Sequence, residues 1–88
     1  MEIYPTSGDS SVFYAELFMR DPRLVAFGAR VRALRKEKGL SQEGLSNLAG
    51  IDRSYMGQIE RGEINLTITK MYQIADALGI TVSTLLTV

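Results

Sequence analysis

The run from residue 52 to residue 61 places side chains that bind nucleic-acid groups on one side of an expected helix. On a wheel of about 100° per residue, Met56 and Ile59 define a buried side, and Glu60 lies at its edge. The opposite side carries Arg53, Ser54, Gly57, Gln58 and Arg61, with Tyr55 at its rim. Arginine pairs with guanine, glutamine with adenine and serine with either, and the run has no carboxylate on this side. The pattern predicts a surface for base edges or phosphates; an ordinary solvated helix face is the alternative.

The composition excludes most catalytic and metal chemistry. The 88 residues contain no histidine and no cysteine, which rules out disulfides, thiolate zinc sites and histidine-dependent triads. No glycine-rich phosphate loop is present, and no pair of carboxylates has a recognisable acid–base setting. We therefore expect a protein that is not an enzyme and that has neither a cofactor nor a metal.

The net charge of zero conceals an uneven distribution. The formal charges of residues 1–21 sum to −3, whereas those of residues 22–70 sum to +4. This positive excess can bind a polyanion, and an ordinary solvated helical surface is the alternative explanation. No apolar run approaches the ~20 residues that span a membrane, and the first residues do not resemble a secretory signal. A cytoplasmic location without membrane contact is expected.

Helix signals divide the chain into one all-α domain, a compact bundle of about five helices, over residues 22–88, preceded by an N-terminal arm over residues 1–21. The arm contains a short apolar segment at 12–20 that suggests a helix. The expected helices of the domain cover 22–38, 42–49, 53–61, a span from about 67 to 78, and a short segment after Thr81. Their expected apolar stripes include Leu45, Leu48 and Ala49 in the second, and Ile68, Met71, Ile74, Ala75 and Leu78 in the fourth.

The helices at 42–49 and 53–61 are joined by Gly50 and Ile51, so they must cross at a steep angle. Gly50 suits a turn that requires positive φ, and Ser41 and Asp52 are expected N-caps. Ser46 and Ala49 are small where the two helices must approach each other. This arrangement is a helix-turn-helix.

Four sequence tracts resemble the Cro/C1-type (XRE) helix-turn-helix family: residues 34–45, the segment from Ala49 to Glu63, and the stretches 65–67 and 74–80. Together they cover about residues 24–86 in the family's order. Asp52 to Tyr55, with Ile59 to Arg61 and Asn65 to Ile68, is similar to the small controller proteins of restriction–modification systems. The resemblance implies a lambda-repressor-like, sequence-specific regulator that binds double-stranded DNA.

The resemblance also implies roles for individual residues. Gln42 matches a phosphate contact at a helix N-terminus, and Arg53, Ser54 and Gln58 match positions that reach base edges. Tyr55 matches a contact to a phosphate or a thymine methyl group. Positions that contact the DNA backbone are matched by Arg61, Asn65 and Thr67. Arg35 and Glu60 match an internal ion pair that orients the first and third helices of the domain.

The chain departs from the family pattern at Gly44, Gly57 and Leu66. Gly44 removes the usual capping-box glutamate, and Leu66 stands where proline is common. Gly57 lies inside the expected recognition helix, where glycine costs roughly 1 kcal/mol relative to alanine. It either allows close approach of DNA or only reduces the rigidity of the helix.

Dense apolar residues end the chain and suggest a twofold interface as well as core closure: Ile80, Val82, Leu85 and Leu86. We expect a homodimer on a near-palindromic operator, because half-sites one turn (~34 Å) apart double the contacts. The alternative is an antitoxin or another protein-interaction module on the same scaffold, with the apolar segment 13–19 as its docking surface.

Overall fold

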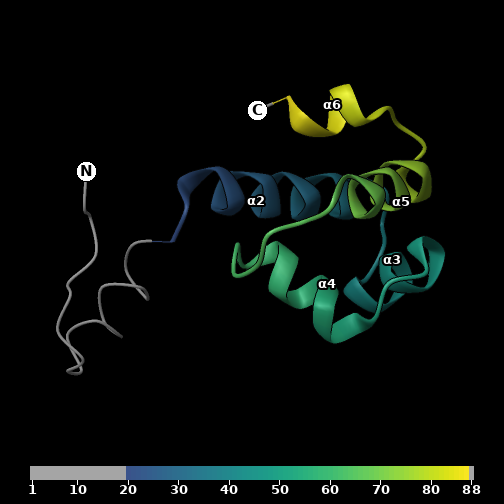
Figure 1. The fold of residues 1–88 in the computed structure, drawn as a ribbon. Coiled ribbons are helices and arrows are strands. Elements are labelled where there is room, and N and C mark those ends of the chain that lie inside the picture. Colours follow the sequence, from purple (N-terminus) through teal and green to yellow (C-terminus); the bar gives the residue numbers. More distant parts are fainter. Residues whose placement is uncertain (1–19, 88) are drawn as a thin grey trace, which may run out of the picture.

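Helices account for nearly all of the regular structure in the computed structural model, which describes residues 20–87 (Figure 1). They are α2 (Pro22–Glu37), α3 (Gln42–Ala49), α4 (Arg53–Glu60), α5 (Ile68–Leu78) and α6 (Val82–Leu86), and this part of the chain contains no strand. The predicted all-α bundle is therefore confirmed. The predicted helix at 12–20 and the docking segment at 13–19 lie outside the described residues, except for Arg20.

Side-chain caps set the start of each of these five helices. Asp21, Ser41, Asp52, Thr67 and Thr81 each accept a hydrogen bond from a backbone N–H in the first turn that follows. Such caps satisfy donors that have no partner within the helix. The predicted boundaries are correct to within one residue: α2 and α4 end at Glu37 and Glu60, one residue before their expected ends.

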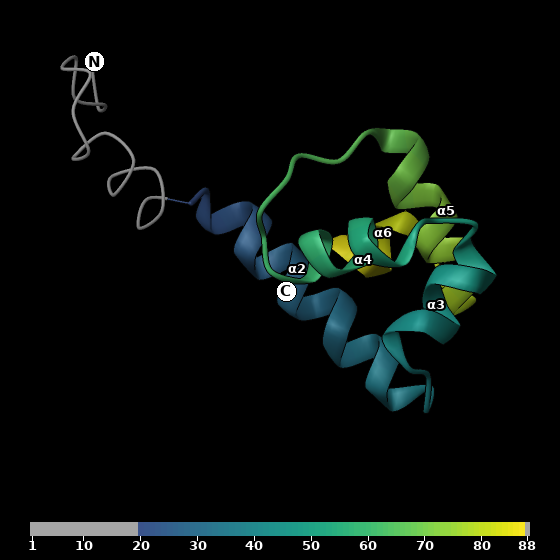
Figure 2. The same cartoon turned by 90° about the horizontal axis from the view of Figure 1, so that it is seen from below.

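The long helix α2 lies between α4 and α6, and α3 and α5 complete the bundle (Figures 1 and 2). α2 packs against α4 and α6, while α3 packs against α4 and α5. At Gly28, a Cβ atom would collide with the carbonyl oxygens of Ile59 and Glu60. This glycine lets α4 approach α2 closely, so the outer side of α4 faces away from the bundle.

The core lies between these helices, and its fully buried members include Val31, Leu45, Met56, Ile59, Ile74 and Leu85. Met56 and Ile59 form the buried side of α4, as predicted. Leu85 has no exposed surface within the single chain. It is therefore a core residue of the single chain, and its place in a dimer interface stays a prediction.

Two apolar side chains predicted to be buried are exposed. Leu48 is 63% exposed and Ile68 is 68% exposed. In α3, the buried residues are Leu45, Ser46 and Ala49, and Leu48 lies about 105° around the helix from the middle of that group. In α5, Ile68 lies about 120° around the helix from Ile74. Within residues 20–87, no helix has the length and hydropathy to cross a bilayer.

Candidate nucleic-acid interface

The turn between α3 and α4 is short and closely held. Gly50 adopts a φ of 69°, in the left-handed region that glycine tolerates. The N–H of Ile51 donates to the Ser46 carbonyl at 3.0 Å, and Ile51 is buried. The Asp52 carboxylate then accepts from the N–H groups of Ser54 and Tyr55. These bonds hold the short turn between the two helices that the sequence predicted.

A buried ion pair ties the end of α4 to α2. Arg35 Nε lies 2.7 Å from Glu60 Oε2, and Arg35 Nη2 donates to Glu60 Oε1 at 3.0 Å. The side chains are only 11% and 4% exposed, and Arg35 Nη1 also donates to the Leu40 carbonyl. The hydrogen bond to Glu60 raises the pKa of Arg35 further above its ordinary value. The pair implied by the family resemblance is present and orients α4 on α2.

Gln42 joins this network from the first turn of α3. Its Nε2 donates to Glu60 Oε1 at 3.1 Å, so Glu60 links three helices. One amide hydrogen and the side-chain carbonyl of Gln42 remain for other partners. The backbone N–H groups of Gln42 and Glu43 begin the helix, and such groups are suited to anions.

A polar groove of about 450 Å³ runs along the outer side of α4 and reaches the start of α3. Its lining contains five of the eight residues predicted to bind DNA, together with one glycine: Gln42, Arg53, Ser54, Gly57, Gln58 and Arg61. The side chains of Arg53, Ser54 and Arg61 are exposed, and Gln58 is half-buried. Donors and acceptors from both helices therefore face one shallow depression.

The other three predicted residues lie outside the lining of this groove. Tyr55 is half-buried against the core, with Lys70 Nζ 5.6 Å from its ring centroid. Thr67 Oγ1 caps α5 by accepting from the Lys70 N–H, which leaves its hydroxyl hydrogen free to donate. Asn65 is exposed and lines an apolar groove beside Phe27.

Sequence reasoning missed Glu63, which brings a carboxylate to the end of the surface predicted to lack one. Arg61 donates to Glu63 through Nε at 2.6 Å and through Nη2 at 3.3 Å. Arg20 Nη2 lies 3.6 Å from the same carboxylate. The hydrogen bond from Arg61 lowers the pKa of Glu63 below its ordinary value and raises that of Arg61. The only signal in the sequence was the opposite charge two residues beyond Arg61.

Comparisons with known proteins agree with this geometry. The family described as "Helix-turn-helix" matches residues 31–85. The control protein C.MunI of a Mycoplasma species is 40% identical over 69% of this chain and 84% of its own length. The control protein C.SmaI of Serratia marcescens is 42% identical over 65% of this chain and 68% of its own length.

A solved structure has the same arrangement. The restriction-modification controller protein C.AhdI from Aeromonas hydrophila matches with a TM-score of 0.71 and 48% identity. The match covers 73% of this chain and 97% of that one. The capped helix pair, the buried ion pair beneath it and these matches together establish that the chain belongs to the helix-turn-helix family, in its Cro/C1-type (XRE) form.

Proposed function

We propose that this protein is a sequence-specific transcriptional regulator that binds double-stranded DNA along the outer side of α4 and catalyses no reaction. The observation that carries the proposal is the polar groove that joins the start of α3 to α4. Its side chains are of the types that recognise base edges and phosphates. The proposed DNA-binding domain is residues 22–88, and a regulator of this kind acts in the cytoplasm.

The two ends of the groove have different roles in this proposal. Arg53, Ser54 and Gln58 read base edges in the major groove, because they face outward from the presented helix. Gln42 binds a phosphate through its remaining amide hydrogen and the helix N-terminus. Asn65 and Thr67 also bind phosphates, Arg61 contacts the DNA at the C-terminal end of α4, and Tyr55 lies at the rim of the surface.

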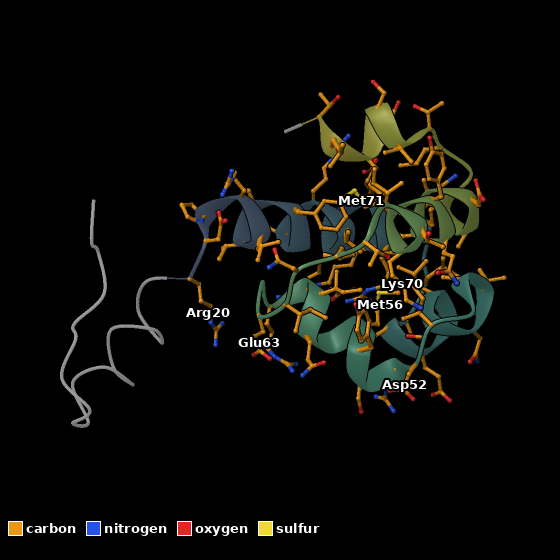
Figure 3. All side chains as sticks on the ribbon, viewed as in Figure 1. Arg20, Asp52, Met56, Glu63, Lys70 and Met71 are labelled. Carbon is orange, nitrogen blue, oxygen red and sulfur yellow. The ribbon has the colours of Figure 1, made fainter. Side chains whose placement is uncertain are left out.

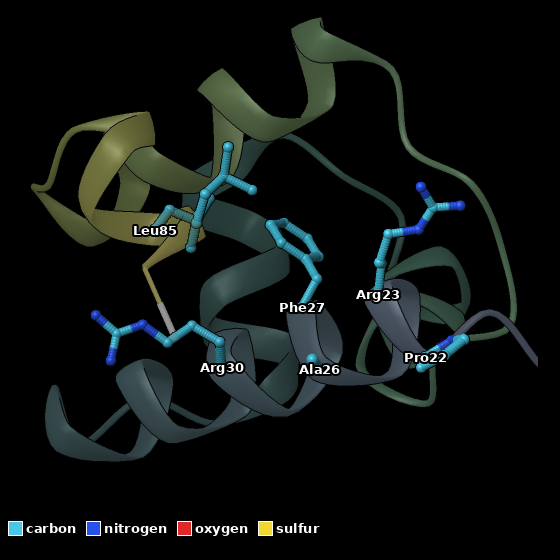
Figure 4. A pocket seen from close by; sticks show the side chains of 7 residues that line it. Pro22, Arg23, Ala26, Phe27, Arg30 and Leu85 are labelled. Atoms are coloured by element: carbon cyan, nitrogen blue, oxygen red, sulfur yellow. The ribbon is translucent and has the colours of Figure 1, made fainter.

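Homodimerisation is the second part of the proposal, and an apolar groove of about 360 Å³ between α2 and α6 supports it (Figure 4). Its apolar lining includes Ala26, Phe27, Leu85 and Leu86, and Leu86 is 49% exposed. Ile80 and Val82 are half-buried and complete the proposed interface. Two copies related by a twofold axis would present two α4 helices to a near-palindromic operator.

The genes of a restriction–modification system are the proposed target. The similarity to C.AhdI, C.MunI and C.SmaI supports this choice, because all three are controller or control proteins. A neighbouring pair of genes for a methyltransferase and a nuclease is the genomic arrangement expected for such a regulator.

Selection of bound duplexes from a random pool tests DNA binding. The wild-type chain should enrich a twofold-symmetric motif, and its affinity should fall steeply between 50 and 200 mM salt, with a logarithmic slope of about −0.9 per phosphate contacted. Enrichment of no sequence, together with binding that salt does not change, would show that the protein is not a DNA-binding regulator.

Sedimentation tests the proposed dimer. Leu86→Glu should weaken self-association by about tenfold or more, because it places a charge in an apolar interface. Leu48→Glu, at an exposed leucine on α3 outside the α2–α6 groove, is the matched control and should leave association unchanged. A wild-type chain that sediments as a monomer with and without its selected DNA contradicts the dimer.

A further inference from the structure

Arg61 is held in place although more than half of its side chain is exposed. Glu63 accepts from its Nε and its Nη2, which are adjacent donors on one edge of the guanidinium group. A guanidinium has five N–H donors in a fixed plane, so this contact orients the whole group. The edge formed by Nη1 and the second hydrogen of Nη2 remains without a partner within residues 20–87.

The free edge of Arg61 lies over Gly57, within the polar groove. A Cβ atom built on Gly57 would lie 3.1 Å from Arg61 Nη1 and 3.4 Å from Gln42 Oε1. The missing side chain of Gly57 thus provides the space that the Arg61 guanidinium occupies. Arg61 and Gly57 both line the groove, so the unpartnered donors are available to a ligand there.

Glu63 is itself held from the opposite side. Arg20, which precedes α2, lies 3.6 Å from the Glu63 carboxylate and donates through Nη1 to the Arg61 carbonyl at 3.1 Å. Figure 3 shows Arg20 extending toward the segment that carries Glu63. The carboxylate therefore sits between two arginines, one just before α2 and one just after α4.

A carboxylate beside a DNA-binding surface repels phosphates, so its contribution must come from what it positions. Building on the proposed DNA binding, we infer that Glu63 is a positioning residue that makes Arg61 a specificity-determining contact. With its orientation set, the free edge of Arg61 offers two parallel donors to a pair of acceptors such as guanine O6 and N7. Without Glu63, the flexible side chain of Arg61 would bind any nearby phosphate.

The test is selection from a random duplex pool with the full chain and three variants: Glu63→Gln, Arg61→Ala and the double variant. Glu63→Gln should lose about tenfold preference at one position of each half-site, the value of one bidentate contact. Its affinity for the unselected pool should stay the same or rise. In the Arg61→Ala background, Glu63→Gln should change no base preference further.

Glu43→Gln is the matched control, because it removes one exposed carboxylate from the first turn of α3 without touching Arg61. It should raise affinity for the selected motif and the pool equally. Arg20→Gln removes the second arginine that holds Glu63, and it should reduce base preference at the same position as Glu63→Gln. Thermal melts establish that each variant is folded.

The inference is overturned if Glu63→Gln leaves the base preference unchanged at every position. It is also overturned if Glu63→Gln causes the same change in base preference when Arg61 is already alanine. An equal loss of affinity for motif and pool in Glu63→Gln also overturns it, because that result indicates a structural role alone. If the wild-type chain enriches no motif, the proposed DNA-binding function fails first, and the inference fails with it.

Discussion

The two ends of α4 differ in how their side chains are held. At the start of the helix, Arg53 and Ser54 are exposed, and their side chains form no hydrogen bond within residues 20–87. At the other end, Glu60 is bound by Arg35 and Gln42, and the residue after the helix, Arg61, is bound by Glu63. One end is free to meet a ligand, while the other is anchored to the rest of the domain.

This difference separates two tasks that one short helix must perform. The anchored end determines where α4 lies, since ion pairs and hydrogen bonds connect it to α2 and α3. The free end can then adjust its rotamers to a ligand without disturbing the fold. The comparison predicts that loss of the buried ion pair at the anchored end costs folding stability, whereas substitutions at the free end cost binding alone.

The largest effect is expected from Glu60→Ala, which leaves the Arg35 guanidinium buried without its carboxylate. Removal of one partner of a buried pair costs about 3–5 kcal/mol of unfolding free energy. Urea denaturation measures it. Ser54→Ala at the free end is the control, with a change within about 0.5 kcal/mol. Equal losses in the two variants would remove the distinction between the ends.

Arg53→Ala should affect binding and leave stability nearly unchanged. The expected loss is roughly 1–3 kcal/mol of binding free energy on the selected motif, with relaxed preference at one base pair. Gln42→Ala, by comparison, should weaken binding to all sequences about equally, since it removes a phosphate contact. Titrations on the motif and on single-base variants measure both. Uniform losses from both variants would refute base reading by Arg53.

Gly57 lies between the two ends of α4, and Gly57→Ala should change folding stability and DNA affinity in opposite directions. Alanine favours the helix by up to about 1 kcal/mol, and its Cβ meets only the flexible ends of Arg61 and Gln42. Stability should therefore rise, while affinity for the selected motif falls because the floor of the groove is filled. Urea denaturation and titration on one preparation test this pair of changes. A rise in both quantities would indicate that Gly57 serves only to loosen the helix.

The smallest expected effect is the pH dependence of the contribution of Glu63. Its pKa is lowered from an ordinary value of 4.5 by the hydrogen bond from Arg61. The stability that this carboxylate contributes is therefore present above pH 4.5 and is lost as the pH falls through the lowered pKa. The stability difference between wild type and Glu63→Gln should be larger at pH 7 than at pH 3. Glu43→Gln controls for the loss of one exposed carboxylate, and a larger difference at pH 3 would contradict the sign.

Much of the fold could be predicted because its signals are local. Capping residues such as Ser41 and Asp52 act within one turn, and Gly50 meets the φ requirement of its own turn. The exposures of Leu48 and Ile68 were predicted wrongly, because an apolar stripe does not reveal how many neighbours a helix has.

By itself, the amino-acid sequence determined the helices, their boundaries to within one residue, the short α3–α4 turn and the side chains on the outer side of α4. Periodicity, caps and short turns act over a few residues, so their effects do not depend on the rest of the chain. Only the tertiary structure decided that Arg20 and Glu63 meet at Arg61, and that Gln42 turns toward Glu60. Those contacts join residues from separate helices and loops, and their geometry exists only once α2, α3 and α4 have packed together.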